Sequence, residues 1–354
     1  MELNLKLVKG KYAFSFILLT GILLGLLIIS LGIGALEITP LEILKIFANH
    51  LGIFETPVDN TMELVIFNIR LPRLIFTMLI GASLGLSGAT LQGLFKNPLV
   101  EPGIIGISSG AALGAILVIM VLERFFPEIL GIARQWFIPV FAFLGGIIAT
   151  IMTLKISQFE GKTKVTYLIL AGVAMTSLAS AIIGIAIFYA DDAQLRTFTF
   201  WTLGDLSVAT WDKLAILFPI TSLSVIVLII LAKPLNAIAL GEAEAFHSGV
   251  AVEKVKFVAI VFSALAVSTA VAFSGIIGFV GLVVPHIIRM CFNADHTIVL
   301  PASAIGGACL LIFADIFART LVAPAELPIG VITALIGTPF FIYLLITAKK
   351  KRLI

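Results

Sequence analysis

The sequence has 354 residues, of which 60% are hydrophobic and only 12% are charged. A soluble domain carries about 25% charged residues, so a water-soluble fold of this length is excluded. The formal net charge of +3 gives no indication of nucleic-acid binding.

Long apolar stretches recur along the chain, and they are continuous rather than alternating. Such stretches predict membrane-spanning helices, because a helix satisfies every backbone amide within its own segment. We predict an all-α polytopic membrane protein, a single transmembrane domain over residues 1–354, whose ten spans cover roughly residues 13–35, 64–92, 103–122, 137–158, 165–190, 211–232, 255–273, 276–294, 297–321 and 328–348. The break at Ser274-Gly275 is the weakest division. One long helix there would give nine spans and move the C-terminus to the other side.

Charged residues orient the predicted bundle. With ten spans, both termini and the connections near residues 93–102, 155–164, 233–254 and 289–296 share one side, which carries most of the 23 Lys and Arg. This excess marks the cytoplasmic side, and the opposite side carries most of the acids. The first apolar run, after Lys6, Lys9 and Lys11, has about 23 residues, longer than the 7–15 of a signal-peptide core. We therefore expect a retained first helix.

Several chemistries are not supported by the sequence. Gly161-Lys162-Thr163 resembles the end of a phosphate-binding loop, but Ile156 stands where the first glycine of that loop is required. The chain is therefore not expected to be an enzyme or to hydrolyse ATP. Cys291, Cys309 and the four histidines lack ligand spacing, so neither a metal site nor a cofactor is predicted.

Few ionisable residues lie near the expected bilayer midplane, where an ion-coupled carrier keeps them. Asp315 and Arg319 are one helical turn apart near an outer end and can pair with each other. An ion-coupled transporter is therefore a weaker alternative than transport driven by another subunit. An intramembrane enzyme is weaker still, because no convergent set of His, Asp, Glu or Ser is evident.

Two sequence patterns bear on architecture. Small residues dominate Gly81 to Ala89 and Gly306 to Ala308, which predicts close helix packing in lipid. In addition, Ser87-Gly88 and Ser274-Gly275 precede Pro98 and Pro285 by the same interval. If this repeat is real, spans 2–5 and 7–10 are offset by an odd number of helices and form an inverted repeat.

A series of motifs, in order along nearly the whole chain, resembles the permeases for iron-siderophore, haem and vitamin B12 uptake, the membrane subunits of type II ABC importers. The motifs are Arg70-Leu71-Pro72-Arg73, Gly81 to Gly88, Gln92, Asn97 to Gly103, Leu170 to Ala174, Phe200 to Gly204, Leu240-Gly241-Glu242, Gly278 to Arg289 and Glu326 to Gly330. The resemblance implies ten helices per subunit and a homodimer in the bacterial cytoplasmic membrane. It also implies two cytoplasmic ATPase subunits, which bind ATP and Mg²⁺, and a periplasmic or lipid-anchored substrate-binding protein.

The connection 233–254 is expected to be the cytoplasmic coupling segment, because it mixes acidic with apolar residues and is too apolar to be left in water. By resemblance, the residues that match the ATPase-coupling segment are Leu240, Gly241, Glu242, Ala245 and Gly249.

Three arginines, Arg70, Arg73 and Arg319, fall near outer span ends, on a side that is otherwise acidic. They match family positions that dock the binding protein, with membrane anchoring, or pairing of Arg319 with Asp315, as the alternatives. By resemblance, the cytoplasmic gate maps onto Asn97, Leu99, Val165 and Thr166.

The stretch 191–201 resembles haem-type and siderophore-type permeases more than the vitamin B12 permease. Arg196 in this stretch is a candidate for the entrance of the translocation path, where it would meet a substrate carboxylate; pairing with Asp191 or Asp192 is the alternative. We therefore expect haem or a ferric siderophore as cargo, with cobalamin as the alternative.

Overall fold

The structure, a computed structural model, describes residues 2–34, 36–53, 59–122 and 134–350. Apart from one short hairpin, its regular elements are helices. Ten apolar helical segments follow one another along the chain: α1 (Glu2–Gly32), α4 (Leu71–Phe95) continuing from α3 (Asn60–Val65) and η1 (Ile66–Arg70), α5 (Ile107–Leu117) continued by η3 (Val118–Leu122), α8 (Arg134–Ser157), α9 (Val165–Phe188), α11 (Trp211–Ile230), α14 (Val252–Ser274), α15 (Val280–Cys291), α16 (His296–Thr320) and α17 (Ile329–Lys350). The shorter elements are α2 (Pro40–His50), η2 (Pro102–Ile105), α10 (Asp192–Leu203), α12 (Ala232–Leu240), α13 (Glu242–His247) and an antiparallel hairpin of β1 (Gln158–Phe159) and β2 (Lys162–Thr163).

Each predicted span corresponds to one of the ten segments, which confirms the expected number. Seven are long and apolar enough to cross a membrane, and the segments 107–122, 280–291 and 329–343 are shorter. The division at Ser274-Gly275 is also confirmed, because α14 ends at Ser274. The predicted span 276–294 is wrong in length: α15 has 12 residues, or about 18 Å, against a hydrocarbon core of about 30 Å. Helix α15 cannot cross the membrane alone.

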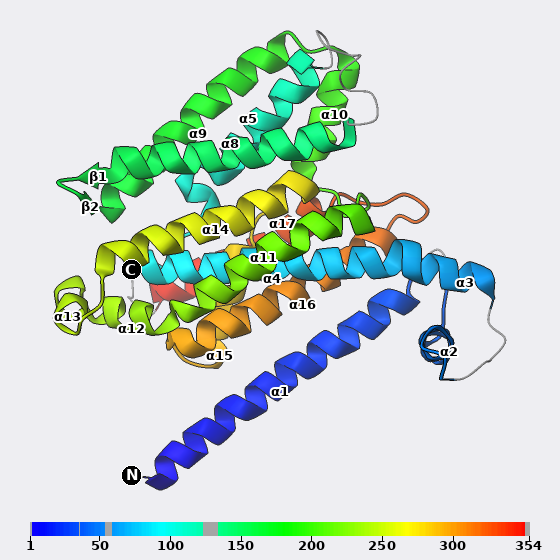
Figure 1. The fold of residues 1–354 in the computed structure, drawn as a ribbon, viewed down its shortest axis with the longest axis horizontal. Coiled ribbons are helices and arrows are strands. Elements are labelled where there is room, and N and C mark those ends of the chain that lie inside the picture. Colours follow the sequence, from blue (N-terminus) through cyan, green and yellow to red (C-terminus); the bar gives the residue numbers. More distant parts are fainter. Residues whose placement is uncertain (1, 35, 54–58, 123–133, 351–354) are drawn as a thin grey trace.

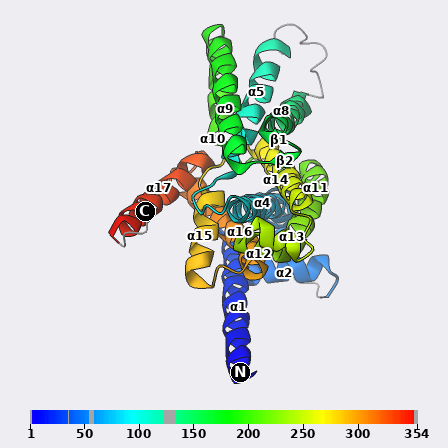
Figure 2. The same ribbon diagram turned by 90° about the vertical axis from the view of Figure 1, so that its left-hand side faces the viewer.

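Helix α4 lies at the centre of the bundle, and small residues set its distance from α16. A Cβ on Gly81 would meet the carbonyl oxygen of Gly307, and one on Gly85 would meet that of Ser303. The two backbones therefore touch, as the small residues predicted. Figure 2 shows α4 at the centre, with α11, α14, α15 and α16 around it.

The segments α5, α8 and α9 form a second group beside the central one. Gly110 of α5 packs against the carbonyl oxygen of Gly145 in α8, and Gly114 packs against the backbone of Phe141. Helix α8 also packs against α14, which joins the two groups. In Figure 1 this group and α10 lie on one side of α4, while α1 crosses α16 on the other side.

The connecting elements divide between the two ends of the bundle. At one end, the α13 end, lie α12, α13, the β1–β2 hairpin, the start of α1 and the end of α17 (Figure 1). The opposite end, the α10 end, carries α2, α3 and α10. The start of α1 and the end of α17 therefore lie at the same end of the bundle, as an even number of spans requires.

Candidate functional site

The helix pair α12–α13 presents apolar side chains at the α13 end. Leu240 is 83% exposed and Phe246 is 69% exposed, whereas Ala245 between them is fully buried. Gly249, which follows α13, has a φ of 86° that favours glycine. Two large exposed apolar side chains on a short, ordered helix pair are typical of a surface that another protein covers. This pair is the segment for which the sequence predicted coupling.

The start of this pair is fixed to α16 by a polar network. The Asn236 side-chain amide donates to Asp295 Oδ1 (2.6 Å), and the Asn236 carbonyl oxygen accepts from the His296 backbone N–H (2.9 Å). Burial raises the pKa of Asp295, but hydrogen bonds from Asn236 and Thr297 outweigh it and hold that pKa below its ordinary value. The carboxylate therefore stays ionised at neutral pH and holds α12 in place.

A second network fixes α13 to α14. Lys256, which is only 3% exposed, donates from Nζ to Glu242 Oε2 at 2.8 Å and to Glu253 Oε1 at 3.0 Å. It also donates to the backbone carbonyl of Thr163 at 3.1 Å. Glu242, predicted to contact the ATPase, thus has an internal partner as well, although its side chain remains 50% exposed.

The four predicted gate residues lie in two segments of the chain, the turn after α4 and the first residues of α9. Asn97 accepts a hydrogen bond from the Leu99 backbone N–H (2.9 Å) and so shapes the turn after α4, where Leu99 is 39% exposed. Val165 and Thr166 begin α9, half-buried and exposed respectively. Helix α9 packs against η2. Within the described ranges, no hydrogen bond joins the two residue pairs directly.

Polar side chains of α4 and of the segment after it bind α15 and the segment before it, which joins the two halves of the chain. Gln92 Nε2 donates to the carbonyls of Val100 and Gly281, both at 3.1 Å, and Gln92 Oε1 accepts from Arg289. Glu101 accepts from the Phe279 backbone N–H at 3.0 Å. Irregular backbone is tolerated inside a membrane protein where such partners satisfy it. Sequence reasoning missed this network, although Gln92 stood among the family motifs.

The predicted docking arginines are buried at the α10 end. Arg73 pairs with Asp315 (2.8 Å) and Glu326 (2.9 Å), and the latter pair is bidentate. Arg70 is 6% exposed and donates to the backbone carbonyls of Leu31, Gly32 and Leu36 at the end of α1.

Arg319 lies 3.1 Å from Asp315, so the alternative expected from the sequence is present, and it also donates to Ser30 Oγ at 2.9 Å. Instead of the exposed basic spot expected from the sequence, Arg73 and Arg319 form an ion-paired cluster with Asp315 of α16 and Glu326 of the segment before α17. Arg70 beside them binds backbone carbonyls.

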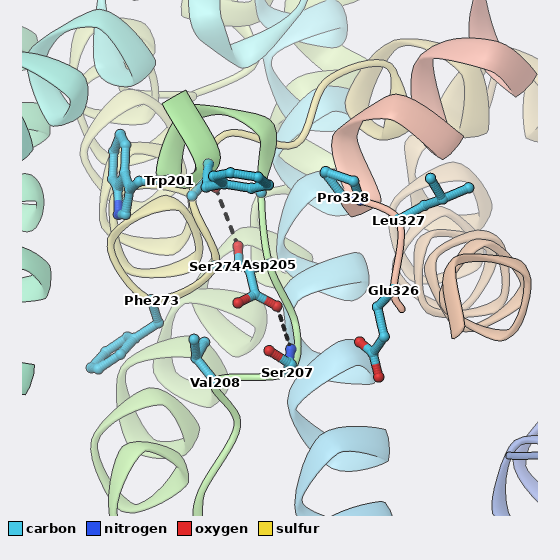
Figure 3. Close-up of a pocket in the computed structure, with 12 residues that line it drawn as sticks. Trp201, Asp205, Ser207, Val208, Phe273, Ser274, Glu326, Leu327 and Pro328 are labelled. Atoms are coloured by element: carbon cyan, nitrogen blue, oxygen red, sulfur yellow. Dashed lines mark hydrogen bonds between the residues drawn. The ribbon is translucent and has the colours of Figure 1, made fainter. Parts of the chain in front are cut away.

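A pocket of about 380 Å³ adjoins this cluster, between α10, the end of α14 and the segment before α17. Figure 3 shows Glu326 on one side of it, and Asp205, whose backbone N–H donates to the carbonyl of Ser274 at 2.8 Å, on the other. The aromatic rings of Trp201 and Phe273 complete the lining. The pocket is therefore acidic and aromatic rather than basic.

Arg196 lies on the exposed surface of α10, one turn before Phe200, whose ring its guanidinium carbon approaches to 5.7 Å. Asp191 instead caps α10 by accepting from the backbone N–H of Gln194. No ion pair joins Arg196 to another residue in the part of the chain that the structure describes.

The described residues contain no group of three or more His, Cys, Asp or Glu placed to hold a metal ion. What they do contain is a bundle of ten apolar segments, an anchored helix pair with exposed apolar side chains at one end, and an ion-paired pocket at the other. These features define the membrane subunit of a transporter.

Comparison with known proteins identifies the kind of transporter. Residues 22–347 match the FecCD transport family, to which the chain belongs. It is 40% identical to the hemin transport system permease protein HmuU of Yersinia pestis over 94% of this chain and 97% of that protein. It is 37% identical to the vitamin B12 import system permease protein BtuC of Escherichia coli over 81% of this chain and 85% of that protein.

The fold matches a solved structure with a TM-score of 0.80 and 33% identity, over 97% of this chain and 99% of that one. That structure is described as an inward-facing ABC transporter of a proposed metal-chelate type. The chain is thus a multi-pass permease subunit with the type II ABC importer fold, in the class that imports iron chelates, haem or vitamin B12. It is a non-enzymatic membrane component.

Proposed function

We propose that this permease moves an iron chelate, haem or a ferric siderophore, across the bacterial cytoplasmic membrane. The similarity to the hemin permease, which covers more of the chain than the similarity to the vitamin B12 permease, supports this cargo. Cobalamin is the alternative cargo. The chain itself holds no cofactor in this proposal, since ATP and Mg²⁺ are bound by the partner ATPase.

The working assembly contains two copies of this chain, two ATPase subunits and a periplasmic or lipid-anchored binding protein, with membrane lipid around the bundle and no nucleic acid. The observation that carries this proposal is the exposed pair Leu240 and Phe246 on a doubly anchored helix pair. Such a pair can transmit a displacement instead of absorbing it. The residues proposed to couple to the ATPase are Leu240, Gly241, Glu242, Ala245 and Gly249.

The α13 end faces the cytoplasm in this proposal, and both termini lie there. The gate of Asn97, Leu99, Val165 and Thr166 is then on the cytoplasmic side, beneath the coupling segment 233–254. Basic residues concentrate at this end, which supports the orientation.

The α10 end receives the binding protein and the cargo. Arg70, Arg73 and Arg319 act there through the ion-paired cluster, where the side chain of Glu326 is 40% exposed and within reach of a docked protein. Arg196, exposed on α10 one turn before Phe200, is the proposed entrance residue.

Uptake into proteoliposomes tests the proposal. The permease is reconstituted with its ATPase and binding protein, and haem, ferric siderophores and cobalamin are offered separately. We expect ATP-dependent uptake of haem or one siderophore that needs all three components. Uptake of cobalamin alone would transfer the chain to the alternative cargo. Uptake by the permease alone on an ion gradient would overturn the proposal.

A further inference from the structure

A buried polar contact at the α13 end joins three elements through one lysine. Lys256 donates hydrogen bonds to two carboxylates, that of Glu242 in α13 and that of Glu253 in its own helix, α14. It also donates to the backbone carbonyl of Thr163 in β2. Lysine is almost never fully buried unless it is paired. We call this set the Lys256 clamp: Lys256, Glu242, Glu253 and the backbone of Thr163.

The clamp holds the backbone of Thr163 at both of its polar groups. Lys256 binds the carbonyl, and Glu253 accepts from the N–H at 2.8 Å. A strand residue held at both groups cannot move independently of α14. Thr163 lies two positions before Val165, where α9 begins. The clamp therefore ends at the base of the helix that carries two of the proposed gate residues.

Little else joins α13 to the hairpin. An open pocket of about 570 Å³ lies between them, lined by Lys162 of β2, by Glu242 and Phe246 of α13, and by Glu253. Across this open space, Lys256 is the side chain that contacts both α13 and β2, in addition to the packing of α14 against each of them. Charge-assisted hydrogen bonds of this kind are directional and short, which suits them to transmit a displacement of α13 to β2.

We propose that Lys256 is a positioning residue that couples movement of α13 to the start of α9, so that ATP hydrolysis in the partner opens the gate. This inference rests on the proposed function, because it takes α13 as the surface to which the ATPase binds. It adds that Glu242 acts inward, through Lys256, as well as outward toward the partner. Coupling then depends on the charge of Lys256 and not on packing alone.

The test compares Lys256→Gln with Lys256→Arg and with Lys155→Gln. Lys155 is the control, because it is an exposed lysine in the last turn of α8, outside the coupling segment 233–254. Each variant is reconstituted with its ATPase and binding protein, and cargo uptake and ATP hydrolysis are measured in the same vesicles. We expect Lys256→Gln to lower uptake per ATP hydrolysed about tenfold, within the range of typical coupling energies, while hydrolysis continues.

Lys256→Arg should restore most of the coupling, because it keeps the charge, and Lys155→Gln should behave as wild type. A merely structural role would instead lower hydrolysis and uptake together, along with thermal stability in detergent. If Lys256→Gln does not insert into the membrane, Glu242→Gln provides the second variant. It removes the carboxylate of the Lys256–Glu242 pair, and because this side chain is half-exposed, the fold accepts glutamine there.

The outcomes separate this inference from the proposed function. A wild-type complex that shows no ATP-driven uptake of any cargo defeats the proposed function. A wild-type complex that transports, together with a Lys256→Gln or Glu242→Gln variant of unchanged uptake per ATP, defeats the role of the Lys256 clamp and leaves the permease function intact.

Discussion

Glycine contacts set the distance between α4 and α16, and they give the first prediction at the scale of single residues. Gly307→Val places a branched side chain against the backbone of Gly81, where even a Cβ has no room. Overpacking of this kind costs about 1–3 kcal/mol. We expect a lower thermal unfolding midpoint of the purified permease in detergent.

The control is Gly21→Val in α1, where a Cβ meets no atom within 4 Å. This variant should unfold at the wild-type temperature. Equal midpoints for both variants would show that α4 and α16 do not approach as closely as the structure describes.

The ion-paired cluster gives a second residue-scale prediction. Asp315 is 2% exposed and forms ion pairs with both Arg73 and Arg319. Asp315→Asn leaves both guanidinium groups buried with less compensation, which costs about 3–5 kcal/mol when a buried pair is broken. We expect much weaker expression and a clearly lower unfolding midpoint.

Glu326→Gln is the contrasting variant, since its side chain is 40% exposed and an exposed partner contributes only about 0–1 kcal/mol. This variant should fold normally. It also tests docking, because it frees the outward N–H groups of Arg73. A changed affinity for the binding protein at low salt would support a docking role for the cluster, and an unchanged affinity would limit the arginines to a structural role.

Sequence reasoning at this scale found the charged residues and one of their pairings, but not the contacts between distant parts of the chain. Arg319 and Asp315 are one helical turn apart, so their contact follows from spacing alone. Arg73 and Glu326 are far apart in sequence, and only the tertiary fold brings them within 2.9 Å. The burial of Lys256 could not be predicted from the sequence either, because Lys254, two residues before it, is the same residue type and is exposed.

The helix pair α12–α13 carries the prediction at the scale of elements. Replacing Leu240 and Phe246 together by Ser removes the exposed apolar surface without touching the buried Ala245. We expect the ATPase to be lost during co-purification while the permease keeps its unfolding midpoint, because desolvated apolar anchors dominate binding energy. The control is Leu44→Ser in α2, which is 67% exposed at the opposite end. Retention of the ATPase by the double variant would contradict coupling through this surface.

Element boundaries show where sequence patterns lose information. Hydrophobic runs located all ten segments, since lipid requires continuous apolar helices. They did not show that α15 has only 12 residues, because residues 275–279 remain apolar although their backbone is not helical. Helix α10 was likewise missed, because its polar residues read as a loop while the Asp191 cap starts a helix.

At the scale of the whole molecule, the two non-helical segments bear on the inverted repeat. Glu101, which follows α4, contacts Phe279, which follows α14, and Gln92 near the end of α4 contacts Gly281 near the start of α15. Equivalent breaks that meet inside the bundle are what repeats related by a two-fold axis in the membrane plane would produce. The inverted repeat of spans 2–5 and 7–10 itself stays a prediction.

Orientation is the last prediction, and it concerns the whole bundle. The α13 end should face the cytoplasm, because it gathers the basic connections. After both native cysteines are replaced, a single cysteine at exposed Ala243 marks the α13 end and one at exposed Asp192 marks the α10 end. In intact cells we expect a membrane-impermeant maleimide that reaches the periplasm to label Asp192→Cys at once, and Ala243→Cys only after the membrane is opened. Labelling in the reverse order would show that the α13 end faces the periplasm. It would contradict the assignment of α13 as the surface that binds the cytoplasmic ATPase.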